Sequence, residues 1–330
     1  NLDWNTVWDV QTSRFDQGWI LEMAQDLQNR TSRPNVTSLS YGWAEWDQCD
    51  IVVCNSSTAE EYISRTNTEL AKLALLGVSV VVASGDAGSP GRTNEGCDAS
   101  VSNPVNPVFP GSSPYVLSVG ATVTLADNSS VNWNSSLCKN DGCTTGLRTR
   151  PINFNDVQWT SGSGFAIYSS EARPSWQDSA VKEYLSSGVQ LPNSSYWNSK
   201  GRGYPDVTAN GHNCPVYDIY GSGQFQGVDG TSCSTPIWAS ILAVLNDHQM
   251  KNGRPNLGFV NPLFYKMASN CPHAFTPVTE PGNSHCTEAT CCSADFGFQT
   301  PPKRTLWNPV TGLGQPNVSA LTHCLDSIFS

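Results

Sequence analysis

Few side chains in this sequence carry a charge, and basic ones are the scarcer kind. Only 14% of the 330 residues are charged, and 18 Lys and Arg against 28 Asp and Glu give a formal net charge of −10. The basic residues form no cluster, so we expect no nucleic acid partner. A protein with few paired carboxylates loses little stability when they are protonated, so this composition suits an acidic environment.

Long hydrophobic runs and metal-binding spacings are also missing. No stretch of about 18 apolar residues occurs, so we expect no membrane span. The sequence neither begins with Met nor carries a signal peptide, which predicts a processed product. No Cys-x-x-Cys pair recurs at zinc spacing, so we expect no zinc site.

Cysteine and N-glycosylation sequences, by contrast, are plentiful. Among the 12 cysteines, the short separations of Cys49 from Cys54 and of Cys138 from Cys143 predict two small disulfide loops. Asn-x-Ser/Thr triplets occur at Asn29, Asn35, Asn55, Asn128, Asn134, Asn193 and Asn317. Together they predict an oxidising, glycosylating pathway that leads to secretion or to a lysosome-like acidic compartment.

The hydrophobic pattern of the first 90 residues predicts helices that alternate with strands. We expect helices over residues 17–29 and 58–76, and strands over 35–41 and 78–83. A strand, a helix and a strand in this order form a right-handed parallel crossover. Asp86 follows the second strand at its carboxyl end, where open α/β sheets place their sites.

The rest of the chain continues this mixed pattern without an internal repeat or a clear linker. We therefore expect one domain over residues 1–330. The polar stretch 128–157 reads as a surface insertion. Further strands are predicted at 115–119, 121–125, 165–168, 207–209 and 217–220, and further helices at 174–185, 237–250 and 261–268.

Residues 230–236, Gly-Thr-Ser-Cys-Ser-Thr-Pro, stand directly before the apolar run 237–245. The run predicts a buried helix with Ala239, Leu242 and Ala243 on one stripe. A serine at the start of such a helix is held rigidly, and the free N–H groups there favour negative charge nearby. That is the geometry of a nucleophilic hydroxyl. The alternative is that Thr231 or Ser232 is an ordinary helix N-cap.

These motifs resemble those of the sedolisins, the serine-carboxyl peptidases. Gly-Thr-Ser-x-Ser-Thr-Pro is similar to their nucleophile motif, and residues 84–88, Ser-Gly-Asp-Ala-Gly, resemble the strand-end motif whose aspartate helps to form the oxyanion hole. Further matches lie in family order at residues 40–42, 109–116, 161–165, 173–177, 204–207 and 307–312. Residues 65–70 and 253–259 add a likeness to the lysosomal tripeptidyl peptidases. The resemblance implies a subtilisin-like α/β fold with a largely parallel sheet flanked by helices.

The resemblance also implies an acid-acting peptidase and assigns roles to residues. Ser232 would be the nucleophile, and a protonated Asp86 would donate a hydrogen bond to the oxyanion. Cys97 would bond to a cysteine within residues 286–292, whereas we expect Cys233, on a buried helix, to be a free thiol. The residues that would line the cleft and bind the peptide substrate are Ser161, Gly162, Ser163 and Gly164.

A base for Ser232 is harder to find. Histidine is absent from the first 211 residues, which excludes the Asp-His-Ser order of subtilisin, and His212 reads as a solvated loop residue. A carboxylate works as a base at acid pH, where imidazole is protonated. The family carries such a base on one helix, as a Glu and an Asp with three residues between them. Glu22 and Asp26 have this spacing but lie too close to residues 40–42.

We therefore expect the acidic pair to lie upstream of Asn1, on a segment that is either cleaved into a bound light chain or lost. The rival hypothesis is a catalytically inactive glycoprotein of the same fold with a binding or assembly role. We also expect the family's calcium site to be lost, because residues 276 and 308 are Thr and Asn where the family has Asp. We accordingly expect no metal and no other cofactor.

Overall fold

The computed structural model describes residues 19–126, 129–130, 147–217, 223–271 and 273–329. Its central sheet has the order β1 (Val36–Leu39), β3 (Ser79–Ala83), β5 (Leu117–Ala126) and β10 (Val207–Asn210), and these four strands run parallel. Two antiparallel strands, β6 (Ser129–Ser130) and β7 (Leu147–Pro151), pair with the far end of β5. The largely parallel sheet that the sequence predicts is confirmed.

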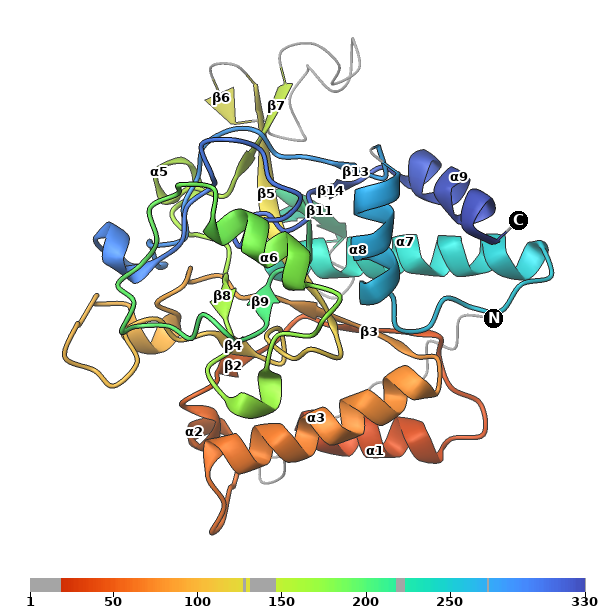
Figure 1. Ribbon diagram of the computed structural model, residues 1–330, viewed down its shortest axis with the longest axis horizontal. Coiled ribbons are helices and arrows are strands. Elements are labelled where there is room, and N and C mark those ends of the chain that lie inside the picture. Colours follow the sequence, from red (N-terminus) through yellow and green to blue (C-terminus); the bar gives the residue numbers. More distant parts are fainter. Residues whose placement is uncertain (1–18, 127–128, 131–146, 218–222, 272, 330) are drawn as a thin grey trace.

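Helices cover both faces of this sheet (Figure 1). On one face lie α1 (Trp19–Asn29) and α3 (Ala59–Leu75), and on the other lies α7 (Thr231–Lys251). Alternate residues of β3 explain the arrangement, since Val80 and Val82 pack into the α1/α3 cluster while Val81 packs into the α7 cluster. Two further helices, α8 (Asn261–Asn270) and α9 (Val318–Phe329), enlarge the core on the α7 side.

Short helices and strands connect the elements of this framework. The helical ones are α2 (Gln48–Ile51), η1 (Arg92–Asn94), α5 (Phe154–Val157), η2 (Ser169–Glu171), α6 (Asp178–Leu185) and η3 (Ala294–Phe296). The strands form antiparallel pairs: β2 (Trp43–Ala44) with β4 (Val108–Phe109), β8 (Gly164–Phe165) with β9 (Gly203–Tyr204), β11 (Cys214–Tyr217) with β12 (Phe225–Val228), and β13 (Phe275–Thr276) with β14 (Gln315–Pro316).

The predicted helix at 58–76 begins with a capping box. The Thr58 hydroxyl accepts from the Glu61 N–H, and the Glu61 carboxylate accepts from the Thr58 N–H at 2.8 Å. The two bonds satisfy N–H groups that the first turn leaves free. The crossover that leads to Asp86 thus begins where the sequence predicts.

Two predicted strands at 115–119 and 121–125 are in fact one strand, β5. Gly120 is a residue of this strand and not a break, because it pairs with Thr208 of β10. A Cβ at Gly120 would lie 2.7 Å from Cγ of Pro205. The glycine is therefore needed for close packing within the sheet.

The predicted apolar stripe of α7 is wrong in part. The buried side chains of the helix include Trp238, Leu242 and Leu245, whereas Ala243 is exposed and Val244 is 56% exposed. The helix therefore packs against the sheet with one side only. Its start is also earlier than predicted, so Ser232 lies within the first helical turn.

Five disulfides occur among the described residues, and two of them were predicted. Cys49 bonds to Cys54, and Cys97 bonds to Cys292. The prediction of a free thiol at Cys233 is wrong, because this residue bonds to Cys214 and ties the start of α7 to the β11–β12 hairpin. The predicted Cys138–Cys143 bridge lies outside the described residues. The two remaining bridges are Cys271–Cys324 and Cys286–Cys291.

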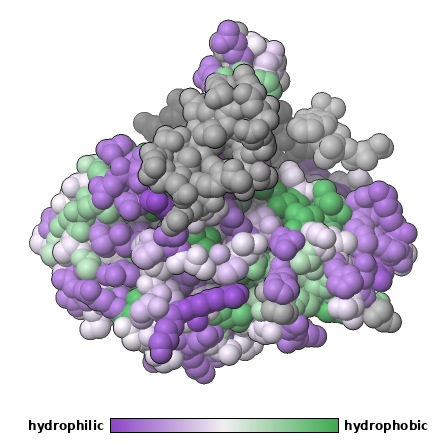
Figure 2. Space-filling view, turned by 90° about the horizontal axis from the view of Figure 1, so that it is seen from above, coloured by the Kyte–Doolittle hydropathy of each residue, from purple (hydrophilic) through white to green (hydrophobic). Residues whose placement is uncertain are grey.

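The surface is compatible with glycosylation at most of the predicted positions. Four of these asparagines are exposed, namely Asn29, Asn35, Asn55 and Asn193. Asn317 is half-buried, while Asn128 and Asn134 lie outside the described residues. The face in Figure 2 is mainly hydrophilic with separate hydrophobic areas, as is usual for protein surfaces. Within the described ranges, no helix is both long and apolar enough to cross a membrane.

Candidate active site

Three segments meet at the carboxyl edge of the parallel sheet. Ser40 follows β1, Asp86 follows β3, and Ser232 lies in the first turn of α7. All three line one cavity, as predicted for Asp86 and Ser232, which are 146 residues apart in sequence. The cavity is lined by Ser40, Tyr41, Gly42, Trp43, Ala44, Ala83, Gly85, Asp86, Ala87, Gly91, Arg92, Thr93, Val108, Thr231 and Ser232.

Ser232 is held at this edge by a reciprocal pair of hydrogen bonds. Its hydroxyl donates to the Ser40 carbonyl at 3.1 Å, and the Ser40 hydroxyl donates to the Ser232 carbonyl at 3.0 Å. The Ser232 carbonyl is available because the residue four positions later is Pro236, which has no N–H to donate. The proline within the helix thus provides the acceptor that fastens α7 to the end of β1.

Asp86 is bound through one of its two carboxyl oxygens. Its Oδ1 accepts from the Thr231 backbone N–H at 2.7 Å and from the Thr231 hydroxyl at 2.8 Å. The other oxygen, Oδ2, lies beside Gly230, where a Cβ would approach it to 3.1 Å. Gly230 has φ +128°, which a residue with a side chain rarely adopts. Glycine at this position therefore allows Asp86 to lie against the start of the helix.

The surroundings of Asp86 favour its protonated form. Burial raises the pKa of this carboxyl above its ordinary value, and the negative charge of Glu288 acts in the same direction. The two Thr231 hydrogen bonds and the positive charge of Arg92 lower the pKa but do not outweigh burial. A carboxyl of this kind can donate a hydrogen bond at acid pH.

Arg92 and Glu288 form an ion pair on the rim of the cavity. Arg92 Nε and Nη2 donate to the two Glu288 oxygens at 2.9 and 2.8 Å. Arg92 Nη2 also lies 3.7 Å from Asp86 Oδ2, which is too far for a hydrogen bond. Neither residue was predicted from the sequence, because they are 196 positions apart and belong to no periodic pattern.

The segment 161–164 does not line this cavity, although it was predicted to bind substrate. All four residues are buried, and the Ser161 hydroxyl accepts from the Ala121 N–H at 2.9 Å. The Gly162 N–H donates to the Gly85 carbonyl at 2.6 Å, and a Cβ at Gly162 would lie 2.2 Å from the Ser84 carbonyl oxygen. Residues 161–164 therefore support the loop that carries Asp86.

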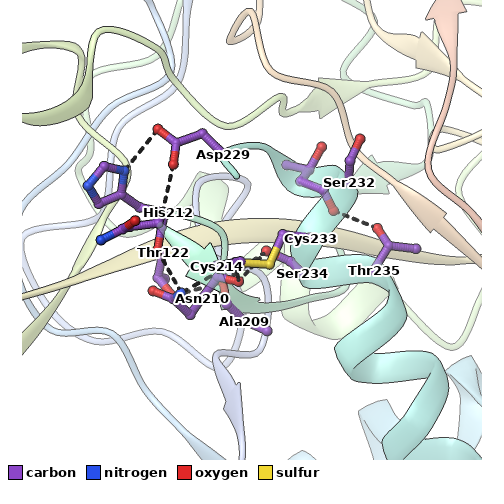
Figure 3. The surroundings of a disulfide bond; sticks show 12 residues. Thr122, Ala209, Asn210, His212, Cys214, Asp229, Ser232, Cys233, Ser234 and Thr235 are labelled. Carbon is purple, nitrogen blue, oxygen red and sulfur yellow. Dashed lines mark hydrogen bonds and ion pairs between the residues drawn. A yellow bond between two sulfur atoms is a disulfide. The ribbon is translucent and has the colours of Figure 1, made fainter. Parts of the chain in front are cut away.

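None of the candidate bases named from the sequence, His212, Glu22 and Asp26, lies at Ser232. In Figure 3 the His212 ring faces Asp229, to which Nδ1 is bound at 2.9 Å, and Ser232 lies on the far side of the Cys214–Cys233 bridge. Glu22 is exposed on α1, and Asp26 on the same helix pairs with Arg30 at 2.6 Å. As expected, neither acid belongs to the cavity, whose lining contains Asp86 as its acidic residue.

Two buried carboxyls lie close to the cavity, one of them directly after the lining residue Ala44. Glu45, directly after β2, and Glu171, in η2, are both 0% exposed and hydrogen-bonded to each other. Glu45 Oε2 accepts from the Ile167 N–H at 2.7 Å, whereas Glu45 Oε1 and Glu171 Oε2 have no hydrogen-bond partner among the described residues. Burial raises the pKa of both groups, that of Glu171 to about 7. Two carboxyls bound to each other must share a proton.

A second cavity lies beside the two tail stretches in which the calcium ligands of the family are predicted to be lost. Residues 277–279, 300–302, 304–306, 308 and 311–314 line it, and the one charged side chain among these described residues is the cation Arg304. Asn308 Oδ1 accepts from the Val310 and Thr311 N–H groups, both at 3.0 Å. Calcium needs several oxygen ligands, usually including carboxylates. The described part of the chain also contains no group of three potential His, Cys, Asp or Glu ligands.

Known proteins resemble this chain in sequence. The model of the Subtilase family matches residues 10–256. Physarolisin from Physarum polycephalum is 40% identical over 309 residues, which are 92% of this chain and 52% of the relative. Human tripeptidyl-peptidase 1 is 35% identical over 307 residues, 93% of this chain and 46% of the relative. The likeness to the tripeptidyl peptidases is thus confirmed, although the identity to physarolisin is higher.

A solved structure shows the same fold. Pseudomonas sedolisin, a serine-carboxyl proteinase complexed with two molecules of pseudo-iodotyrostatin, superposes with a TM-score of 0.63 at 22% identity. The match covers 93% of this chain and 68% of that one. The chain spans about half the length of the curated relatives it matches. On the family match, the identities and the shared fold, this chain belongs to the subtilase family, as a member of sedolisin type.

Proposed function

We propose that this chain is the nucleophile-bearing part of an acid-acting serine-carboxyl peptidase, either an endopeptidase or a tripeptidyl peptidase. The observation that carries the proposal is the meeting of Ser232 and Asp86 in one cavity, with a raised pKa at Asp86. Five disulfides among the described residues and the exposed N-glycosylation sequences support a product of the secretory pathway that is secreted or delivered to a lysosome-like compartment.

In the proposed reaction Ser232 Oγ attacks the carbonyl carbon of the scissile peptide bond and loses its proton to a carboxylate base. The Asp86 O–H donates to the oxygen that becomes negative. Collapse of the tetrahedral intermediate releases the amine with a proton from the base, and water then hydrolyses the acyl-enzyme. Because Asp86 must be protonated, activity should decline as the pH rises through its pKa.

The base would come from a segment outside these 330 residues. Ser232 donates to a backbone carbonyl, and no carboxylate other than Asp86 lines the described cavity. The matched relatives are about twice as long as this chain, which leaves room for an upstream acidic pair. We propose that this pair is supplied by the longer protein or by a bound light chain.

The test compares the full-length precursor, activated at acid pH, with residues 1–330 alone, using a fluorogenic peptide mixture. We expect turnover from the former that Ser232→Ala abolishes, and none from the latter. Ser240→Ala, at an exposed position of α7, is the matched control and should retain activity. If the activated precursor shows no Ser232-dependent turnover, the role of an inactive binding or assembly protein replaces the peptidase. If residues 1–330 alone are active, the base lies within this chain.

A further inference from the structure

Arg92 lies within ion-pair distance of the proposed oxyanion acid but directs its hydrogen bonds to Glu288 and not to Asp86. Its Nη2 is 3.7 Å from Asp86 Oδ2, whereas two of its N–H groups donate to Glu288 at 2.8 and 2.9 Å. Asp86 Oδ1 already accepts two donors from Thr231. Oδ2 is therefore the oxygen left to carry a proton toward the cavity.

Glu288 is placed beside Arg92 by a loop with several anchors. The Cys286–Cys291 bridge closes this loop, and Cys292 directly after it bonds to Cys97. The Thr287 hydroxyl donates to the Glu95 carbonyl at 3.3 Å, close in sequence to Arg92. A carboxylate on such a short, tethered loop has little freedom to leave its partner.

We infer that Glu288 is a positioning residue: it holds the Arg92 guanidinium away from Asp86 Oδ2, so that this oxygen keeps the proton it would donate to the oxyanion. Without Glu288, the half-exposed Arg92 side chain could move the short distance to Oδ2 and pair with an ionised Asp86. An ionised Asp86 has no hydrogen to donate and would repel a developing oxyanion. The inference rests on the proposed role of Asp86.

The charges around this group are few and can be named. Asp86 faces Arg92 and Glu288, and Arg92 faces these two acids and the Tyr41 ring hydroxyl. Arg92 favours the ionised form of Asp86, while Glu288 opposes it. Removing the charge of Arg92 should therefore raise the pKa of Asp86, and removing the charge of Glu288 should lower it.

The first experiment measures kcat/KM against pH for the activated full-length enzyme. Glu288→Gln should move the alkaline limb of the profile to lower pH by about half to one unit, and Arg92→Gln should move it to higher pH by a similar amount. Because Glu288 is inferred to act through Arg92, the double variant should lie close to the Arg92→Gln profile and not to the Glu288→Gln profile. Asp178→Asn removes the carboxylate charge from the Arg173–Asp178 pair, at 2.9 Å and outside the cavity lining, and should leave the limb unchanged.

The second experiment reads the proton on Asp86 without turnover. Infrared carboxyl spectra of the Ser232→Ala protein are titrated with and without Asp86→Asn, so that the difference reports Asp86. The pKa of Asp86 should be lowest in the Glu288→Gln protein and highest in the Arg92→Gln protein. The same order with no peptidase activity in the parent would overturn the proposed function and keep this inference. An unchanged or reversed order would overturn the inference, whether or not the enzyme is active.

Discussion

Burial raises the pKa of Asp86 and of the Glu45–Glu171 pair, but the surroundings of the two sites differ. At Asp86, one oxygen accepts two hydrogen bonds from Thr231 and the other faces a cavity, with an arginine 3.7 Å away. At the glutamates, both side chains are fully buried, and each has one oxygen without a hydrogen-bond partner among the described residues. The proton on Asp86 is thus available to a substrate, whereas the shared proton holds two segments of the core together.

The two sites should therefore respond to acid in separable ways. Protonation of Asp86 would govern turnover, because this residue lines the cavity and its Oδ1 is already occupied by Thr231. Protonation of the glutamate pair would govern stability, because the ionised pair would place unpaired negative charge in the core. Substitutions at each site can separate turnover from stability.

The largest effect is expected from Asp86→Ala in the activated full-length enzyme. This change removes one oxyanion donor, which typically costs about 10²–10³-fold in kcat. The thermal unfolding midpoint at pH 4.5 should change little while turnover is lost, because the carboxyl is at the edge of a cavity. A variant that keeps parental kcat would contradict the assigned role.

Glu171→Gln should flatten the dependence of stability on pH. In the parent, the folded pKa of Glu171 is about 7, above the unfolded value of about 4.3. The shared proton's contribution is therefore complete below about pH 4.3 and is lost as the pH rises through about 7, with a slope of up to about 1.4 kcal/mol per pH unit for one proton.

In the Glu171→Gln protein, the amide N–H that replaces the carboxyl can donate to Glu45 without a titrating proton. Thermal unfolding midpoints measured between pH 4.5 and 7 should fall less steeply than in the parent, while kcat at pH 4.5 stays similar. Glu60→Gln, at an exposed position, is the control and should keep the parental slope. An equal slope in the Glu171 variant would show that the pair does not govern stability.

Thr231→Val should leave the Asp86 carboxyl with fewer hydrogen-bond donors, as at the buried glutamate pair. It removes one of the two hydrogen bonds that favour the ionised carboxylate, so the pKa of Asp86 should rise. The alkaline limb of kcat/KM should move to higher pH by up to about one unit. Movement to lower pH would mean that the limb reports another group.

The smallest effect is expected from chelation. The tail cavity offers Arg304 and an Asn308 side chain already bound to backbone N–H groups, so we predict no calcium requirement. Dialysis against EDTA should leave the unfolding midpoint and the activity unchanged. A drop that calcium restores would show that backbone carbonyls alone suffice to hold the ion.

Local signals in the sequence were reliable where neighbouring residues decide the structure. The helix predicted over 58–76 begins with the Thr58–Glu61 capping box, and the run 78–83 forms the predicted strand shortly before Asp86. The motif around Ser232 places the serine at the start of a helix, as observed. These features depend on spacing within a few residues.

Features made by distant segments could not be predicted in this way. The Cys233 side chain reaches Cys214 because a hairpin lies beside the first turn of α7, and nothing local to position 233 indicates that hairpin. Gly162 looks like a cleft residue, yet its lack of a Cβ is needed against the Ser84 carbonyl. The Arg92–Glu288 pair depends on the fold of the whole chain.

The Cys97–Cys292 bridge joins positions 195 apart in the sequence. Since ribosomes add about 5–20 residues per second, Cys97 is made roughly 10 to 40 s before its partner. During that interval β3, Asp86 and the nearby Arg92 exist without Glu288, which is also made late. The rim of the cavity is therefore completed among the last events of biosynthesis, and a nascent chain that stops short of residue 288 would carry the nucleophile without the charge balance beside it.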